Sequence, residues 1–415
     1  MVVKSKSFIG VWGVIIALSI VARCNSQLLF RSSGIEYILL FVSSCIAISL
    51  NLKSFLSKPI LLCDVFFAAS LVLFISSDEL SKYIIVICIC TLFYYAVQNC
   101  NSEIKYVEIP LVAFAIFTSV VTWISFFSPT FYTSKILTLF PEGSSLAYRF
   151  LHRNMYHGFT NHYSRNSYYI ITGIIMLFSS AITRKKRSGI KLILIAFLFC
   201  TEFLVAKRGP TLFLIAALFI AYLKKEPSFA HKVEKSLKFV AVGIGLFILA
   251  YFFVPGVSNI VSRILSPNSS DDISSSRFYL WGVAINLFEN KPIFGNGWGS
   301  YLQAMSGTTF QGAHNDYFQF LAETGIIGLA IHLFAEISCL YYTGKAFKYF
   351  NEEQYQGTLE QKWIFFSYAF QIFILLYALT GMPHYSYEQY GLYLMICGFS
   401  IGLYKHRKRY NEGEI

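Results

Sequence analysis

Apolar segments long enough to cross a lipid bilayer follow one another along the whole of this sequence. A transmembrane helix needs roughly 20 apolar residues, or fewer where the polar ends of side chains reach the interface. About twelve segments fit this requirement, near residues 8–22, 35–51, 59–76, 83–98, 107–127, 167–183, 190–206, 211–223, 238–254, 325–343, 363–380 and 389–404. Only 13% of the 415 residues are charged, against about 25% in soluble domains. The sequence therefore predicts an all-α polytopic membrane protein of about twelve transmembrane helices, with residues 1–415 forming a single transmembrane domain.

The placement of basic residues predicts the orientation. The net charge of +12 could indicate nucleic-acid binding, but Lys and Arg gather in short segments between the spans, as the positive-inside rule describes. If both termini are cytoplasmic, about two thirds of the 34 Lys and Arg residues lie on the cytoplasmic side. Residues 8–22 lack a small-residue cleavage site, so we expect a retained first helix rather than a signal peptide. The partner we expect is the lipid bilayer, not nucleic acid, with two long loops, residues 128–166 and 255–324, facing outward.

The outer loop 255–324 is the longest polar interval in the sequence. It contains SSSRFYLW (Ser274–Trp281), KPIFGNGWGSY (Lys291–Tyr301) and AHNDYFQFLAETGIIG (Ala313–Gly328). Loops of this length are usually either functional or disordered, and the many aromatic residues here argue against disorder. We interpret the loop as an ordered, partly helical cap over an active site.

Arg208 is the most informative single charge, because it lies at the junction of two apolar spans. A charge at membrane depth costs about 2.5–3.5 kcal/mol on insertion scales and usually faces a polar cavity. Pro210 suits the first turn of the following helix, which would place Arg208 near a helix N-terminus, a favourable position for a phosphate. The alternative is a side chain that snorkels to the interface, which fits Lys207 better.

Two further residues in loop 255–324 could carry chemistry. Arg277 opens FYLWGVAINLF, an amphipathic helical pattern, although it could simply pair with Asp271 or Asp272. His314 precedes a helix that enters the membrane, and a neutral imidazole can accept a proton from a hydroxyl or position it. The alternative for His314 is a purely structural role.

Other ionisable residues are weaker candidates. The external group His152, Arg153, His157, His162 and Arg165 could form a second polar lobe, but its spacing does not indicate a metal site. The cysteines show no metal-binding or disulfide spacing, and GNGWG lacks the strand-turn-helix context of a dinucleotide fingerprint. Four ionisable residues lie inside predicted spans and either act in function or pair with one another and cap helices; they are Asp64, Glu202, His332 and Glu336.

Three stretches together resemble the O-antigen ligase and polymerase superfamily of multi-span glycosyltransferases. They are AKRGP with Arg208, SSSRFYLWGVAINLFENKPIFGNGWGSY with Arg277, and AHNDYFQFLAETGIIGL with His314. The resemblance covers about residues 145–400. Two more stretches look like segments of repeat-unit polymerases and favour that branch, namely Gly158–Tyr169 and Tyr377–Leu394. The second departs from the branch's pattern at Met382 and at His384-Tyr385-Ser386.

The resemblance implies transfer of a glycan from undecaprenyl pyrophosphate to an acceptor hydroxyl at the periplasmic face of the bacterial inner membrane. No metal and no cofactor is expected, and a chain-length regulator is a conceivable partner. Arg208 and Arg277 would hold the pyrophosphate, and His314 would position or deprotonate the hydroxyl. The expected substrate-binding residues include two aromatic rings for stacking on sugars, Trp298 and Tyr301; the others are Asn315, Lys207, Arg165, His162 and Gly297.

Two alternatives stay open at this point. A ligase that transfers finished polymer to lipid A–core would use nearly the same residues. A lipid-linked oligosaccharide flippase or another transporter would also suit many spans, but transporters usually show paired halves with matching broken helices, and no such symmetry is visible in the sequence.

Overall fold

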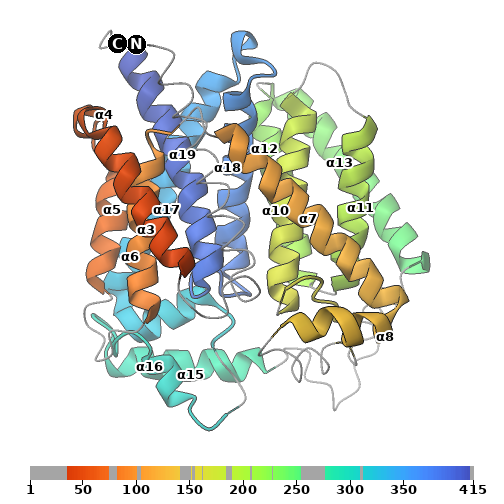
Figure 1. Ribbon diagram of the computed structural model, residues 1–415, viewed down its shortest axis with the longest axis horizontal. Helices are drawn as coiled ribbons and strands as arrows, with labels where there is room; N and C mark the ends of the chain where they lie inside the picture. Colours follow the sequence, from red (N-terminus) through yellow and green to blue (C-terminus); the bar gives the residue numbers. More distant parts are fainter. Residues whose placement is uncertain are drawn as a thin grey trace. The chain divides into compact units, whose positions relative to one another are not determined.

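The computed structural model describes residues 35–73, 82–100, 104–140, 151, 155–160, 162–183, 189–205, 208–226, 228–253, 276–308 and 312–411 (Figure 1). The secondary structure in these residues is helical throughout. The chain divides into two compact units, one made of Met1–Pro110 with Ser276–Ile415 and the other of Leu111–Ser275. The predicted first span, Lys207, His152, Arg153, Asp271 and Asp272 lie outside the described residues.

Helices occupy the predicted spans within the described part of the chain. Most of the helix ends lie within a few residues of the predictions, as in α10 (Tyr163–Thr183), α11 (Gly189–Val205) and α18 (Leu359–Tyr377). Three described helices are long and apolar enough to cross a membrane by themselves, namely α7 (Ile104–Phe127), α10 and α17 (Asp316–Phe350). The all-helical architecture is consistent with a polytopic membrane protein.

The first unit is organised around α17. This helix packs against α5 (Leu62–Val72), α18 and α19 (Tyr387–Asn411), and α19 packs against α6 (Lys82–Val97). In Figure 1 these helices stand upright, while α15 (Arg277–Asn290) and α16 (Ser300–Ala304) lie across their lower ends. The remaining described helices of this unit are α3 (Ile35–Leu50), α4 (Leu52–Ser57) and the short η5 (Glu353–Tyr355).

One of the predicted intramembrane charges forms a buried pair in this unit. Lys405 Nζ donates to Asp64 Oδ2 at 2.6 Å and to Gln98 Oε1 at 2.8 Å. The same carboxylate accepts the Leu61 N–H at 2.9 Å and so caps α5, while Tyr94 Oη donates to its other oxygen at 2.8 Å. The Asp64 network therefore ties α5, α6 and α19 together, which agrees with the pairing and capping alternative for this residue.

The long helix α17 is broken at Gly325, and the break is filled by a neighbouring turn. Gly325 has φ 65° and ψ −169°, far from helical values, so the backbone groups on both sides lose their partners within the helix. Residues 292–297 supply replacements: the Asn296 and Gly297 N–H groups donate to the carbonyls of residues 322 and 323. In return, the N–H groups of residues 326 and 327 donate to the carbonyls of residues 292 and 293.

This exchange explains the glycines in the turn. Gly295 has φ +73°, and a Cβ there would lie 2.4 Å from the backbone carbonyl carbon and oxygen of Glu323. Only a residue without a side chain allows the turn to approach the broken helix so closely. The motif GNGWG (residues 295–299) and the motif TGIIG (residues 324–328) therefore contact each other.

The second unit contains most of α7, then α8 (Pro129–Phe131), η3 (Tyr132–Ile136), η4 (Leu137–Leu139), α10, α11, α12 (Arg208–Lys225) and α13 (Phe229–Phe253). Helix α10 packs against α11 and α12. The buried Glu202 accepts hydrogen bonds from Ser167 at 2.5 Å and Thr211 at 3.4 Å and so connects these three helices. Glu202 therefore has a structural role. The described part of loop 128–166 is partly helical.

Comparing Gly295→Ala with a control variant should separate two costs of adding a side chain in this turn: the cost of the close contact with Glu323 and the cost of the left-handed backbone conformation. The left-handed conformation costs a non-glycine residue about 1–2 kcal/mol, and the contact with Glu323 should add about 1–3 kcal/mol of overpacking. Gly299→Ala is the matched control, because Gly299 also has positive φ (+86°) but faces open space. We expect the thermal midpoint of the detergent-purified protein to fall clearly more for Gly295→Ala. Equal losses would contradict the proposed contact.

Candidate active site

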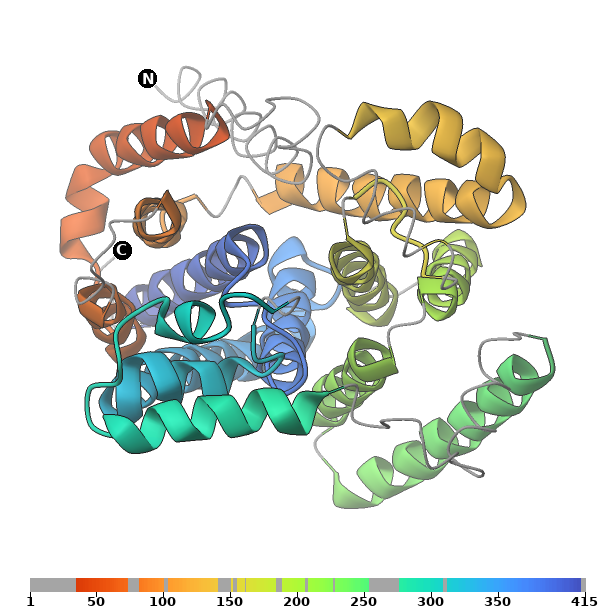
Figure 2. The ribbon, with the colours of Figure 1, turned by 90° about the horizontal axis from the view of Figure 1, so that it is seen from below.

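Arg277 and His314 belong to one small cap on the first unit. The cap has its own core, made of Leu280, Ala284, Tyr301, Met305, Ala313 and Ala322. Figure 2 shows α15 running across α17, and the two helices are in contact. Leu280 lies one turn after Arg277 on α15, and Ala313 directly precedes His314. The core that joins these two neighbours therefore holds the predicted arginine and histidine on the same cap.

His314 is held in an unusual backbone conformation. Its φ is +51°, a region that non-glycine residues seldom adopt and that often marks functional sites. The side chain is exposed, while Ala313 and Asn315 on either side are buried. Asn315 caps α17, since its side chain accepts the Phe318 N–H at 3.2 Å. The chain thus turns sharply at the helix start and presents the imidazole outward.

A buried network supports this segment from behind. Gln319 accepts the Ala313 N–H at 3.1 Å and donates to Glu323 at 3.1 Å. Glu323 also accepts the Tyr385 hydroxyl at 2.9 Å. Both acceptor and donor groups of Gln319 are therefore used to fix the residue before His314.

The loop between α18 and α19 supplies the second support. Asp316 donates its backbone N–H to Ala378 O at 2.9 Å. Its carboxylate accepts the backbone N–H of His384 at 3.0 Å and lies 2.6 Å from His384 Nδ1. The stretch in which the sequence departs from the polymerase pattern is the one that holds Asp316, two residues after His314.

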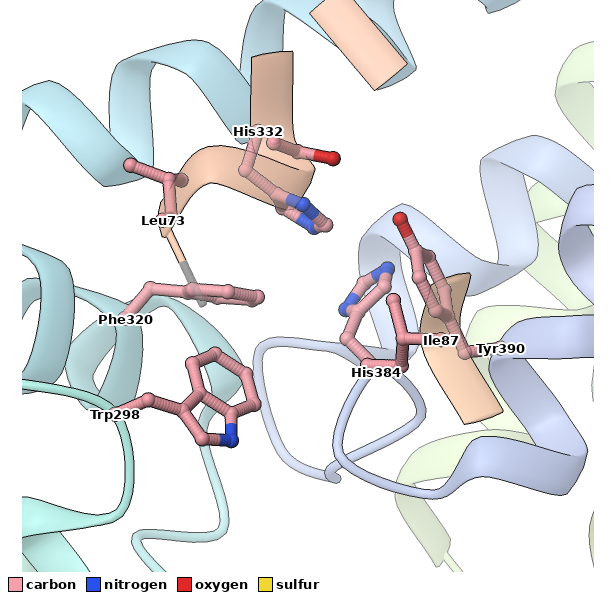
Figure 3. A pocket seen from close by; sticks show the side chains of 8 residues that line it. Leu73, Ile87, Trp298, Phe320, His332, His384 and Tyr390 are labelled. Carbon is pink, nitrogen blue, oxygen red and sulfur yellow. The ribbon is translucent and has the colours of Figure 1, made fainter. Parts of the chain in front are cut away.

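Trp298 is partly available for contact with a ligand. Its ring stacks on Tyr385 with centroids 4.7 Å apart and planes 5° apart, and Phe320 packs against it at 5.8 Å. Figure 3 shows it beside a small cavity that His332, His384 and Tyr390 also line. The indole is half-buried, so its stacking role toward sugars stays a prediction.

Three expected substrate-binding residues have structural roles in the first unit. Tyr301 is fully buried and donates its hydroxyl to Leu280 O at 3.0 Å, so the expectation that its ring stacks on a sugar is wrong for this structure. Gly297 donates its N–H to Glu323 O at 2.9 Å within the helix break. Asn315 is buried and occupied as the helix cap.

The remaining predicted residues lie in the second unit or at the edge of the cap. Arg277 is the first residue of α15 and is half-exposed. Arg208 is the first residue of α12, and Pro210 lies in the first turn of that helix, as the sequence predicts. His162 and Arg165 are half-exposed near the start of α10. That Arg208, His162 and Arg165 act together with His314 stays a prediction.

His157 has a structural role in the second unit. The side chain is buried, and its Nδ1 lies 2.7 Å from Thr160 O and 2.9 Å from Tyr132 Oη. Because Thr160 O can only accept, Nδ1 carries the proton and the ring is neutral. Burial lowers the pKa of His157 to about 4, since it disfavours the charged imidazolium. His157 therefore fixes the loop before α10 instead of binding a ligand.

Comparison with known protein families identifies the region that carries these residues. Residues 158–333 match the O-antigen ligase family (Wzy_C). This region is a domain of the O-antigen polymerase and ligase superfamily. No curated protein matches the chain. The O-antigen ligase domain includes Arg208, Arg277 and His314, so the three residues singled out from the sequence lie within the family-defining region.

Sequence reasoning missed most of the supporting network of the O-antigen ligase domain. Gln319 and Glu323 are separated by four residues in a helix, a spacing that brings side chains together, and this was the available signal. The pairing of Asp316 with His384 spans 68 positions, and no local pattern indicates it.

The Asn315 cap should matter both for stability and for activity. Asn315→Ala should cost about 1 kcal/mol, as lost N-caps do, and should also release the conformation of His314. Thr358→Ala is the matched control, because Thr358 caps α18 by accepting the Gln361 N–H at the same distance of 3.2 Å. We expect similar losses in thermal midpoint but reduced surface-glycan synthesis for Asn315→Ala alone. Equal synthesis in the two variants would show that the cap does not position His314.

The low pKa of His157 predicts a loss of stability in acid. The unfolded chain takes up a proton near pH 6.5, whereas the folded protein resists it until about pH 4, so the stabilisation is present above pH 6.5 and is lost as the pH falls through this window. At full protonation the loss is on the order of 3 kcal/mol. The measurement is the thermal midpoint between pH 7.5 and 4.5. His157→Gln should be less stable at pH 7.5 and show a flatter profile; an unchanged slope would refute the assignment.

Proposed function

We propose that this protein is a surface-polysaccharide polymerase that joins repeat units carried on undecaprenyl pyrophosphate. The reaction takes place at the periplasmic face of the bacterial inner membrane, with about twelve spans and both termini in the cytoplasm. The proposal is supported by the O-antigen ligase domain at residues 158–333 and by the apolar helices. Its substrates are a lipid-linked glycan donor and a glycan acceptor.

The observation that carries the proposal is the cap that holds Arg277 and His314 together. Transfer breaks the bond between the sugar and the pyrophosphate, so negative charge grows on the leaving group. A fixed guanidinium stabilises that charge most effectively where little water is present. The exposed imidazole of His314 accepts the proton of the acceptor hydroxyl as the new glycosidic bond forms.

The second unit carries further residues that we propose for binding the donor. The start of α12 places Arg208 at a helix N-terminus, where backbone N–H groups and the helix dipole also favour a phosphate. Lys207, His162 and Arg165 add positive charge and hydrogen-bond donors for the pyrophosphate and the sugars. Trp298 offers an aromatic surface to the glycan. In this proposal the protein's own cations supply the positive charge at the leaving group.

The ligase is the second candidate, and the description of the matched family favours it. The two stretches Gly158–Tyr169 and Tyr377–Leu394 favour the polymerase. Within the second stretch, His384 and Tyr385 hold the segment that carries His314. Because these are residues at which the stretch departs from the polymerase pattern, this contact does not separate the two branches. The flippase is less favoured. The residues that the cap carries, Arg277 and His314, suit a glycan-transfer reaction better than the transport of a lipid-linked glycan.

A gel of surface glycans from cells that lack the protein distinguishes these functions. Loss of the ladder with one repeat unit still attached to the lipid core supports the polymerase. Polymer that remains on the undecaprenyl carrier indicates the ligase instead. Repeat units that accumulate at the cytoplasmic face indicate a transporter and overturn the enzymatic proposal.

Alanine variants of Arg277 and His314 should abolish the ladder in the same cells. Removing a group that stabilises transition-state charge costs about 10²–10³-fold in rate, and removing a general base costs about 10²–10⁴-fold. Lys291→Ala is the control for Arg277, since Lys291 is an exposed cation just beyond the other end of α15. His231→Ala, an exposed histidine in α13, is the control for His314. A full ladder from His314→Ala at matched protein levels would remove His314 from the mechanism.

A further inference from the structure

Four ionisable side chains meet inside the first unit. His332 and Glu336 lie one turn apart on α17, Asp316 begins the same helix, and His384 comes from the loop between α18 and α19. None of the four is more than 3% exposed. Glu336 Oε1 lies 2.6 Å from His384 Nε2 and 3.6 Å from His332 Nε2. The second nitrogen of His384 lies 2.6 Å from Asp316 Oδ2. Of these contacts, the proposed glycan transfer uses only that of Asp316 with His384, as support for the segment that carries His314.

Several polar atoms of this cluster have no hydrogen-bond partner although they are buried. They are His332 Nε2, Glu336 Oε2 and Asp316 Oδ1. An unsatisfied buried polar atom costs about 1–3 kcal/mol. Two of the three belong to His332 and Glu336, which are neighbours on α17, so a ligand bound between these two side chains would remove much of this cost. Figure 3 shows the rings of His332 and His384 facing a shared cavity. That cavity measures about 10 Å³, close to the space that one water molecule requires, and its other lining residues are mostly apolar.

The cluster places two buried carboxyl groups against one histidine, with Asp316 on one ring nitrogen of His384 and Glu336 on the other. Burying carboxyl groups is expensive unless they are paired or coordinate a metal. A divalent cation beside Glu336 would add positive charge to this acidic cluster.

The donor atoms suit a transition metal. Two imidazole nitrogens and one carboxylate oxygen, each within 4.8 Å of the others, form a set that zinc commonly takes. With metal–ligand bonds of about 2.0–2.1 Å, tetrahedral ligands lie about 3.3 Å apart. This value falls between the 2.6 Å from Glu336 Oε1 to His384 Nε2 and the 3.6 Å from Glu336 Oε1 to His332 Nε2, so His384 would move slightly away from Glu336 to admit the ion. Metal-bound histidines usually give their other nitrogen to a carboxylate, as His384 does to Asp316.

We propose that His332, Glu336 and His384 bind one divalent transition metal ion, with zinc as the first candidate, and that Asp316 orients His384. The ion joins α17 to the loop between α18 and α19 and so secures Asp316 at the start of the helix. This site revises the expectation of a metal-free protein from the sequence, where 48 positions separate Glu336 from His384. It stands on its own geometry and does not depend on the polymerase assignment.

The test uses full-length protein purified in detergent without immobilised metal or chelator. Metal content is measured by mass spectrometry, and the thermal midpoint is followed through chelation and readdition of zinc. We expect about one equivalent of metal per chain, a lower midpoint after chelation and recovery with zinc. His332→Asn and Glu336→Gln should lose at least nine tenths of the metal. Asp316→Asn should weaken zinc affinity about 10–100-fold.

Glu323→Gln is the matched control, because Glu323 is an equally buried carboxylate of α17 that Gln319 and Tyr385 already satisfy. It should keep the metal. Equal loss of metal in Glu323→Gln would overturn the assignment of ligands. Wild-type protein that holds no metal, takes up none from micromolar zinc, copper, nickel or iron(II), and keeps its midpoint under chelation would show that the cluster is a proton-sharing ion pair. This wild-type measurement decides the question even if the variants fail to fold.

Discussion

The break in α17 at Gly325 is the constraint on which the outer part of the first unit depends. A helix interrupted inside a bundle must find other partners for its freed backbone groups, since none can be left unsatisfied in an apolar setting. The turn at residues 292–297 supplies them on both sides of the break. The turn at residues 292–297 directly follows α15. Its hydrogen bonds to the broken helix α17 therefore also fix the position of α15. The cap with Arg277 and His314 is built on this contact.

Buried polar groups connect the helices of the first unit at two levels. Asp64 with Lys405 and Gln98 joins α5, α6 and α19. Asp316 and Glu336 with His384 join α17 to the loop that precedes α19. Helix association in a membrane has no hydrophobic driving force between spans, so packing and hydrogen bonds between helices determine it. Removing one partner of such a buried pair leaves the other charge uncompensated. This lowers the stability of the protein far more than replacing both partners with apolar residues.

The sequence allowed the helices to be predicted but not the contacts between them. Hydropathy and the glycine, proline and asparagine residues at the ends identify spans and caps, because these signals act over a few residues. The role of Tyr301 could not be read in this way: Trp298 and Tyr301 look alike in the motif, yet one lines a cavity and the other donates to Leu280 inside the cap core. The pairing of Asp316 with His384 spans 68 positions. It depends on how three helices pack, which no short pattern encodes.

The conformation of His314 follows from what its neighbours must do. Asn315 has to lie in an extended conformation to cap α17, and Ala313 has to enter the cap core, where its N–H is held by Gln319. The chain joins these two fixed points with a φ of +51° at His314, which costs about 1–2 kcal/mol for a side chain other than glycine. Glycine would relieve that strain but would leave no imidazole at the surface. A histidine at a position where the backbone favours glycine therefore agrees with the chemical role that we propose for His314.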